Sequence, residues 1–146
     1  MLIASSKPEL LDLLRQTLLP RAEILEAYLF GSTARGEAGP LSDIDVAVRL
    51  VHDHPTHLGF GYAAELSADL MAALGSNRVD VVVLNDAPPL LYHRVLRDGI
   101  RLASRDLAST TTREGQALSR YCDFQLQQRK VDAAASTRMA RGDFGR

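Results

Sequence analysis

Two short apolar runs, each adjoining polar residues of a particular kind, constrain this chain more than any other feature. The first run, 24–30, leads directly into a Gly-Ser pair at 31–32, and the second, 44–50, begins immediately after Asp43 and contains Asp45. Both runs are predicted to be strands. Because side chains alternate between the two faces of a strand, Asp43 and Asp45 are expected on one face and the apolar residues on the other.

The two aspartates predict a metal site. Two carboxylates at this spacing repel each other and lose hydration in a folded protein unless a cation lies between them. Oxygen ligands from a few carboxylates, with the other positions left to water and phosphate, are typical of Mg²⁺. An isolated Asp-x-Asp also occurs in calcium-loop fragments and solvated loops, but its position against a hydrophobic strand favours the metal. Asp43 and Asp45 are therefore predicted metal ligands.

The Gly-Ser pair predicts a site for phosphate. Gly31 lets the backbone turn tightly and approach a ligand closely. Ser32 and the residues after it are expected to form a short helical turn whose N–H groups face an anion. The Ser32 hydroxyl is able to donate to phosphate oxygens, and Arg35, one turn further on, to pair with them bidentately. Since a Gly-Ser pair alone is usually just a turn, this assignment of nucleotide-binding residues depends on the nearby aspartates.

The order of these motifs resembles that of a known family. A Gly-Ser pair, about ten residues and then Asp-x-Asp on a strand is similar to the pattern of the polymerase-beta-type nucleotidyltransferases. The segment 29–48 most resembles the minimal nucleotidyltransferases (MNT) of prokaryotic toxin–antitoxin pairs, the MntA-like antitoxins that act with a HEPN-domain toxin. Segments 88–99 and 120–124 are also similar to that family, so the resemblance covers nearly the whole chain.

The resemblance implies an α/β (α+β) fold in which helices flank a small mixed sheet and a long helix ends the chain. It also implies a third carboxylate on a neighbouring strand, where Asp80 lies within the run 79–84. That run is nearly all β-branched, so we expect a central, buried strand. Asp80 is then expected to face the metal pocket of Asp43 and Asp45; the alternative is a strand-end residue satisfied by a backbone N–H or by Arg78.

The activity implied by the resemblance is Mg²⁺-dependent transfer of AMP from ATP to a tyrosine hydroxyl of the cognate HEPN toxin, a ribonuclease that is thereby silenced. Asp43, Asp45 and Asp80 would be the catalytic residues and would hold two Mg²⁺ ions, with pyrophosphate as the leaving group. The toxin would be a hetero-oligomeric partner. A Walker-type phosphate motif is absent, which argues against transfer of a γ-phosphoryl group.

Two other functions stay open. The first is a nucleotidyltransferase for small molecules, of the kind that modifies aminoglycosides. Those enzymes usually carry an additional helical domain, which we do not expect within these 146 residues. The second is a catalytically silent antitoxin that neutralises its partner by binding alone. The clustered carboxylates argue against the second function, because a silent relative has no physical reason to hold them.

Composition and charge indicate the number of domains, the kinds of partner and the cellular location to expect. A length of 146 residues, 46% of them hydrophobic and 24% charged, is typical of one globular domain. Seventeen basic and eighteen acidic residues give almost no net charge, which argues against direct binding of nucleic acid. We find neither a secretory signal nor an apolar run long enough to cross a membrane. The single cysteine, Cys122, fits a reducing environment, so a cytoplasmic location is expected.

Helices are expected on either side of the strands. Ser6 and Glu9 are typical of a capping box and open a leucine-rich amphipathic helix that ends at Pro20 and covers one face of the sheet. A second amphipathic helix is expected over 58–74. A third helix, from 88 to 98, is expected to precede a short edge strand at 100–103.

The C-terminal part of the chain is expected to form one long helix. Thr111 and Glu114 are typical of a capping box, and an incomplete apolar stripe follows over 112–139. We therefore divide the chain into a nucleotidyltransferase core, 1–108, and a C-terminal helix of the same single domain, 109–146. This helix is expected to contact the partner, and packing on the domain is the alternative.

Three histidines, His52, His54 and His57, form a further group of possible ligands. Their spacing resembles that of a transition-metal site. Pro55 lies among them and opposes regular structure, and no cysteine or second histidine cluster completes a tetrahedral set. A polar loop is the preferred interpretation, and the role of the three histidines stays open.

Overall fold

A four-stranded mixed sheet forms the centre of the computed structural model, which describes residues 6–37, 39, 42–51 and 61–142. The strands lie in the order β3-β2-β1-β4. β1 is antiparallel to both β2 and β4, whereas β2 and β3 are parallel. The predicted mixed sheet is confirmed. The bounds of the strands are β1 Ile24–Phe30, β2 Ile44–Leu50, β3 Val79–Val83 and β4 Ile100–Ser104.

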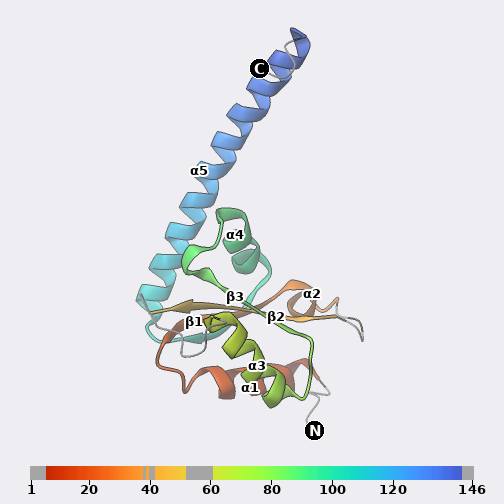
Figure 1. Cartoon of the computed structure of the whole chain (residues 1–146). Coiled ribbons are helices and arrows are strands. Elements are labelled where there is room, and N and C mark those ends of the chain that lie inside the picture. The colour runs from red at the N-terminus through yellow and green to blue at the C-terminus, as the bar shows by residue number, and fades with distance from the viewer. Residues whose placement is uncertain (1–5, 38, 40–41, 52–60, 143–146) are drawn as a thin grey trace.

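Helices cover both faces of the sheet. α1 and α3 lie on one face, and α4 and α5 lie on the other (Figure 1). The short helix α2 follows β1 directly, at the end of the sheet where β2 begins. The bounds of the helices are α1 Lys7–Leu18, α2 Gly31–Arg35, α3 Tyr62–Leu74, η1 (a 3₁₀ turn) Leu84–Asp86, α4 Pro89–Asp98 and α5 Leu107–Ala140.

The first helix is built as the sequence predicts. The Ser6 hydroxyl caps α1 by accepting a hydrogen bond from the backbone N–H of Glu9 at 3.4 Å. Leu10, Leu14 and Leu18 recur every four residues and are buried against the sheet. Together with α3, this leucine stripe encloses the larger of two apolar cores, so the predicted cover for one face of the sheet is confirmed.

The position of β3 differs from the prediction. Its β-branched sequence predicts a central strand, but β3 lies at the edge of the sheet and pairs with β2 alone. Val79 and Val81 are buried while Asp80 is exposed. The run of valines reflects the cover that α3 provides on one face, and this cover does not require a neighbour on both sides of the strand. The prediction of a short edge strand at 100–103 is confirmed by β4.

The start of the long helix also differs from the prediction. α5 begins at Leu107, and its cap is Asp106, whose carboxylate accepts a hydrogen bond from the backbone N–H of Ser109 at 3.3 Å. Thr111, the predicted cap, lies inside the helix and donates its hydroxyl to the carbonyl oxygens of Leu107 and Ala108. Aspartate and threonine offer similar capping chemistry, and here the residue that comes earlier in the chain is used.

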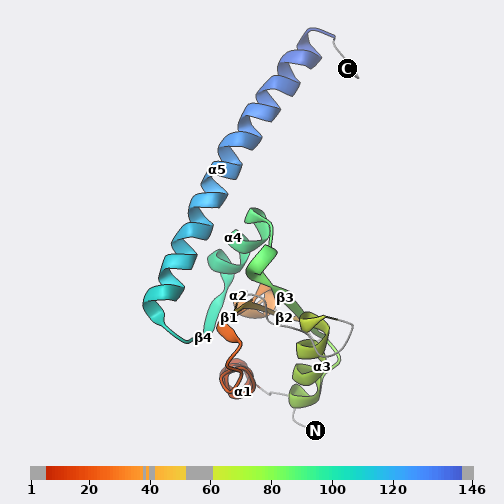
Figure 2. The same ribbon diagram turned by 60° about the vertical axis from the view of Figure 1, so that its left-hand side comes forward.

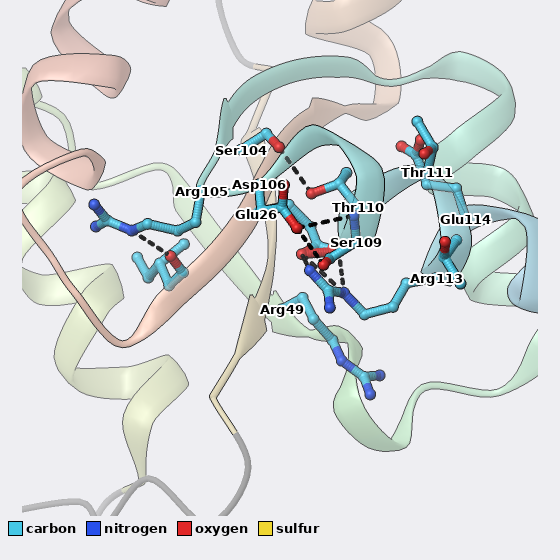
Figure 3. A network of polar contacts seen from close by, with 12 residues as sticks. Glu26, Arg49, Ser104, Arg105, Asp106, Ser109, Thr110, Thr111, Arg113 and Glu114 are labelled. Atoms are coloured by element: carbon cyan, nitrogen blue, oxygen red, sulfur yellow. Dashed lines mark hydrogen bonds and ion pairs between the residues drawn. The ribbon is translucent and has the colours of Figure 1, made fainter.

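A buried ion pair attaches the first turns of α5 to the sheet (Figure 3). Glu26 of β1 is completely buried, and Arg113 donates to both of its carboxylate oxygens, at 2.8 and 2.6 Å. Next to this pair, the Tyr28 hydroxyl donates to Glu114 at 2.7 Å, and Arg101 forms an ion pair with the same carboxylate. Glu114 therefore connects α5 to β1 and β4. The sequence pattern instead predicts that Glu114 is part of a capping box at the start of the helix.

The second half of α5 projects away from the domain, as both views of the fold show (Figures 1 and 2). Where α5 passes α4, Tyr121 stacks on His93, with ring centroids 3.7 Å apart. Ala117 is buried, and the same side of the helix continues beyond the domain through Phe124 and Val131, which are exposed. The domain thus leaves an apolar stripe of α5 uncovered.

Two sequence predictions fall wholly or partly on residues that the structure does not describe. His52, His54 and His57 lie outside the described residues, as do the first residues of the second predicted helix. Within the described residues, α3 begins at Tyr62 and ends at Leu74, with Gly75 as its cap. No helix in the described part of the chain is long and apolar enough to cross a membrane.

Candidate active site

The predicted phosphate turn and the first aspartates meet where β1 ends and β2 begins. In the antiparallel pairing of these strands, Phe30 lies opposite Asp45. Gly31 follows Phe30 with φ +74°, and a Cβ atom at this position would overlap a carboxylate oxygen of Asp45. The left-handed backbone favours glycine here, and the absence of a Cβ leaves room for the Asp45 carboxylate.

Asp80 lies beside the other aspartates because of the register in which the parallel strands β2 and β3 pair. Asp45 and Asp80 are direct neighbours across β2 and β3, so their side chains leave the sheet on the same face. The backbone N–H of Ile44 donates to the carbonyl oxygen of Arg78 at 2.8 Å, which holds the start of β2 beside β3. Asp43 directly precedes Ile44 and is exposed. The structure therefore brings together the three predicted carboxylates, one half-buried and two exposed.

The charges of the two other acidic groups act on the ionisation of Asp45. Burial raises the pKa of the Asp45 carboxyl, and the negative charges of Asp80 and then Asp43 raise it further. The guanidinium of Arg35 acts in the opposite direction. An ionised Asp45 is therefore disfavoured by its surroundings, and a cation between the carboxylates would relieve this repulsion.

The donor set fits a magnesium ion that is shared with a bound phosphate. Asp43, Asp45 and Asp80 supply only oxygen ligands. Among the described residues, no three acidic, histidine or cysteine side chains lie close enough together to form a ready-made metal cage. Mg²⁺ commonly binds in this way, through one or two carboxylates, water and substrate phosphates. The residues thus fit Mg²⁺ if a nucleotide completes its coordination.

Helix α2 places the predicted phosphate-binding residues beside this group. Ser32 is half-buried in its first turn, and Arg35 is its last residue. The Arg35 guanidinium donates to Glu37 at 3.0 Å and to Asp98, the last residue of α4, at 3.3 Å. Its roles and those of Gly31 and Ser32 toward a nucleotide stay predictions.

Two residues that hold α2 in place do not stand out in the sequence. The Thr33 hydroxyl donates to the backbone carbonyl oxygen of Asp43 at 3.1 Å and so links the phosphate turn to the start of β2. Lys7, in the first turn of α1, donates to the carbonyl oxygen of Ala34 at 2.7 Å. No local pattern indicates either contact, because Lys7 and Ala34 are 27 residues apart and Thr33 and Asp43 are joined by the loop between the motifs.

Comparison with known sequences identifies the family. A sequence model described as "Polymerase beta, Nucleotidyltransferase" matches residues 13–108, which contain the whole candidate site. The chain belongs to this nucleotidyltransferase family. A comparison with curated proteins finds no match.

Chains from solved structures of toxin–antitoxin pairs are similar to this chain. A chain from a crystal structure of a toxin–antitoxin with AMP-PNP is 26% identical, with a TM-score of 0.68; the match covers 90% of this chain and 98% of that one. A chain of the MntA–HepT toxin–antitoxin is 25% identical, with a TM-score of 0.61, over 89% of this chain and 96% of that one. The predicted resemblance to these antitoxins is confirmed.

A third structure has the same fold at lower identity. It contains a tri-AMPylated HEPN toxin of Shewanella oneidensis in complex with an MNT antitoxin. The matched chain is 23% identical to this nucleotidyltransferase, with a TM-score of 0.68, over 90% of this chain and 99% of that one. The predicted α/β nucleotidyltransferase fold is confirmed by all three structures.

Replacing Gly31 with alanine is expected to reduce nucleotidyl transfer by at least about a hundredfold, because the new Cβ would displace the Asp45 carboxylate. Gly36→Ala is a matched control, since Gly36 has φ +76° but a Cβ added there would meet no atom within 4 Å. Both variants are expected to lose about 1–2 kcal/mol of unfolding free energy through the left-handed backbone alone. Urea unfolding and transfer rates measure the two effects, and equal loss of transfer in both variants would contradict the proposed contact.

Proposed function

We propose that this chain is a Mg²⁺-dependent protein adenylyltransferase and acts as an antitoxin. It would transfer AMP from ATP to a tyrosine hydroxyl of a cognate HEPN-domain toxin, with release of pyrophosphate. The observation that carries the proposal is the pairing of Asp45 with Asp80 on one face of the sheet, beside Gly31, in a member of this family. The similar toxin–antitoxin structures support the choice of acceptor.

The residues of the candidate site have different roles in the proposed reaction. Ser32 and Arg35 bind the outer phosphates and orient the triphosphate, so that the acceptor hydroxyl lies in line with the α-phosphorus. Asp43 and Asp45 would hold Mg²⁺, with Asp80 as a ligand of a second ion. When bound, Mg²⁺ supplies charge stabilisation for the phosphates and lowers the pKa of the acceptor hydroxyl.

Proton transfer is assigned to Asp80. The acceptor oxygen forms a bond to the α-phosphorus, and the bond from that phosphorus to the bridging oxygen of pyrophosphate breaks. Asp80 takes the proton from the acceptor hydroxyl. Its exposure at the edge strand supports this role, because a hydroxyl on another protein must reach it. No residue of this chain becomes covalently modified.

The projecting part of α5 is proposed as the contact element for the toxin. Phe124, Val131 and Met139 lie on the side of the helix that buries Ala117 within the domain, and all three are exposed. An apolar stripe of this kind fits a helical partner packed alongside. Phe124→Asp with Val131→Asp is expected to abolish co-purification with the toxin while ATP binding stays unchanged. Co-purification of the double variant would contradict this assignment.

The direct test uses the product of the neighbouring gene. The toxin is incubated with this chain, ATP and MgCl₂, and its intact mass is then measured. AMP-sized additions that map to a tyrosine are expected, and none should form without Mg²⁺. Unmodified toxin that is nevertheless neutralised would favour the antitoxin that acts by binding alone. Transfer of AMP to an aminoglycoside, together with growth protection by this chain alone, would favour the enzyme for small molecules.

A further inference from the structure

Arg35 forms ion pairs with two carboxylates, and one of these lies far from it in the sequence. The predicted phosphate-binding role does not explain this distant partner. One N–H of its guanidinium donates to Glu37, two residues further along the chain. Another donates to Asp98, which is 63 residues away at the end of α4. The Asp98 side chain is 15% exposed, whereas that of Glu37 is 66% exposed. The contact with Asp98 is therefore the more enclosed of the two.

The end of α4 lies near the end of β1, because β4 follows α4 directly and pairs with β1. The backbone N–H of Gly99 donates to the carbonyl oxygen of Val95 at 2.8 Å. A Cβ atom on Gly99 would overlap that carbonyl group and would lie 3.4 Å from the carbonyl oxygen of Leu29. Gly99 thus permits the tight end of α4, after which Ile100 pairs with Leu29 of the strand that ends in the phosphate turn. Asp98, the last residue of α4, therefore lies near this end of β1.

Asp98 is ionised and oriented before any nucleotide binds. Its two carboxylate oxygens accept hydrogen bonds from Arg97, at 3.0 and 2.9 Å. These bonds lower the pKa of Asp98, and the charge of Arg35 lowers it further. Asp98 therefore presents a negative charge to Arg35 throughout the neutral pH range.

Arg35 keeps donors for a phosphate while it contacts Asp98. A guanidinium carries five N–H groups, and the bonds to Glu37 and Asp98 use two of them. The remaining three have no protein acceptor among the described residues. Arg35 ends the short helix whose first residue, Gly31, lies against the Asp45 carboxylate, and its charge also acts on Asp45. One arginine therefore connects the end of α4 with the position expected for the triphosphate.

We infer that Asp98 is a positioning residue that holds the Arg35 guanidinium in the orientation in which it binds the triphosphate of ATP. This inference rests on the proposed function and adds a residue that the phosphate motif does not contain. A free arginine side chain loses rotamer freedom when it binds a ligand, and an ion pair formed beforehand removes part of that loss. Asp98 acts through Arg35 and does not itself touch the nucleotide.

The test measures binding of ATP with MgCl₂ to the full chain by calorimetry, together with KM and kcat for transfer to the toxin. Asp98→Asn is expected to weaken ATP binding by about tenfold and to raise KM by a similar factor with little change in kcat. Asp98→Glu is expected to recover part of the affinity. Asp69→Asn, which removes the exposed carboxylate paired with Arg21 on the other face of the sheet, is the matched control and should bind ATP normally.

A double-mutant cycle separates positioning from a structural effect. Arg35→Gln is expected to weaken ATP binding more than Asp98→Asn does, and adding Asp98→Asn to Arg35→Gln should cause no further loss. An equal loss in both backgrounds would show that Asp98 supports only the fold of α4 and would overturn the inference. Tighter ATP binding by Asp98→Asn would also overturn it, since Asp98 would then compete with phosphate.

The outcomes also distinguish this inference from the proposed function. An unchanged dissociation constant for Asp98→Asn, in a chain whose wild type binds ATP and modifies the toxin, would overturn the inference alone. Coupling between Arg35 and Asp98 in ATP binding, without any modification of the toxin, would support the inference and overturn the proposed acceptor. A wild-type chain that binds no ATP would overturn both.

Discussion

Replacing Asp45 with asparagine is expected to reduce nucleotidyl transfer by roughly a thousandfold, because several kcal/mol of metal-dependent stabilisation of the transition state would be lost. The amide keeps the shape of the side chain but not its charge. The fold should not weaken, since burial and the charges of Asp80 and Asp43 raise the pKa of Asp45 and make its ionised form unfavourable. We therefore expect an unfolding free energy at neutral pH equal to or above that of the wild type.

The pH dependence of this stability difference follows from the same shift in pKa. The folded-state pKa of Asp45 lies above its ordinary value of 3.8, so the ionised carboxylate destabilises the fold at all pH values above the raised pKa. Below the ordinary value, the carboxyl is protonated in both states and the penalty disappears. The advantage of Asp45→Asn is accordingly expected at neutral pH and should vanish as the pH falls through this range.

Controls for this variant are available on the opposite face of the sheet. Asp12→Asn removes a carboxylate of α1 that is 3.9 Å from Arg15, and transfer should be unaffected. MgCl₂ with ATP is expected to raise the Tm of the wild type and of Asp12→Asn more than that of Asp45→Asn. Full transfer activity in Asp45→Asn would remove this aspartate from the catalytic group.

The second large effect is expected at the buried ion pair that attaches α5. Arg113→Met leaves the Glu26 carboxylate completely buried without its cation, so the unfolding free energy should fall by about 3–5 kcal/mol. The double variant Glu26→Met/Arg113→Met should regain most of this loss, because replacing both charges by apolar groups removes the unpaired charge. Urea unfolding of the two variants measures the difference.

An exposed ion pair is the comparison for this prediction. Arg21 and Asp69 lie 2.6 Å apart, but the Asp69 side chain is 53% exposed, so Asp69→Asn should cost less than about 1 kcal/mol. Hydrogen exchange gives a second readout, since α5 should lose protection in Arg113→Met and regain it in the double variant. A loss below about 1 kcal/mol for Arg113→Met would mean that α5 is held by its apolar contacts and not by this pair.

The proposed roles of α5 and of the buried pair are connected. The first turns of α5 are fixed by Arg113 and Glu114 on the sheet, and the helix then leaves the domain beyond Tyr121. A projecting helix can orient a partner only if its base is rigid. The ion pair between Glu26 and Arg113 is therefore expected to influence binding of the toxin as well as stability, although it lies far along the helix from the exposed stripe.

Much of the candidate site follows from local patterns. The apolar runs predict β1 and β2 with the observed bounds, and alternation along β2 predicts that Asp45 lies on the opposite face from Val46 and Val48. Gly31 is predicted as a tight turn, and it has a positive φ. These predictions succeed because the direction of a side chain on a strand and the conformational freedom of glycine depend on the residue and its immediate neighbours.

Contacts between residues that are far apart in the sequence could be identified only from the three-dimensional structure. The partners Glu26 and Arg113 are 87 residues apart, and Arg35 and Asp98 are 63 residues apart. The edge position of β3 likewise depends on which strand pairs with β2, whereas its valines indicate only that one of its faces is covered. A local pattern reports which faces of an element are apolar. Pairing across the sheet and the docking of α5 depend on the packing of the whole chain, and this packing brings Asp80 beside Asp45.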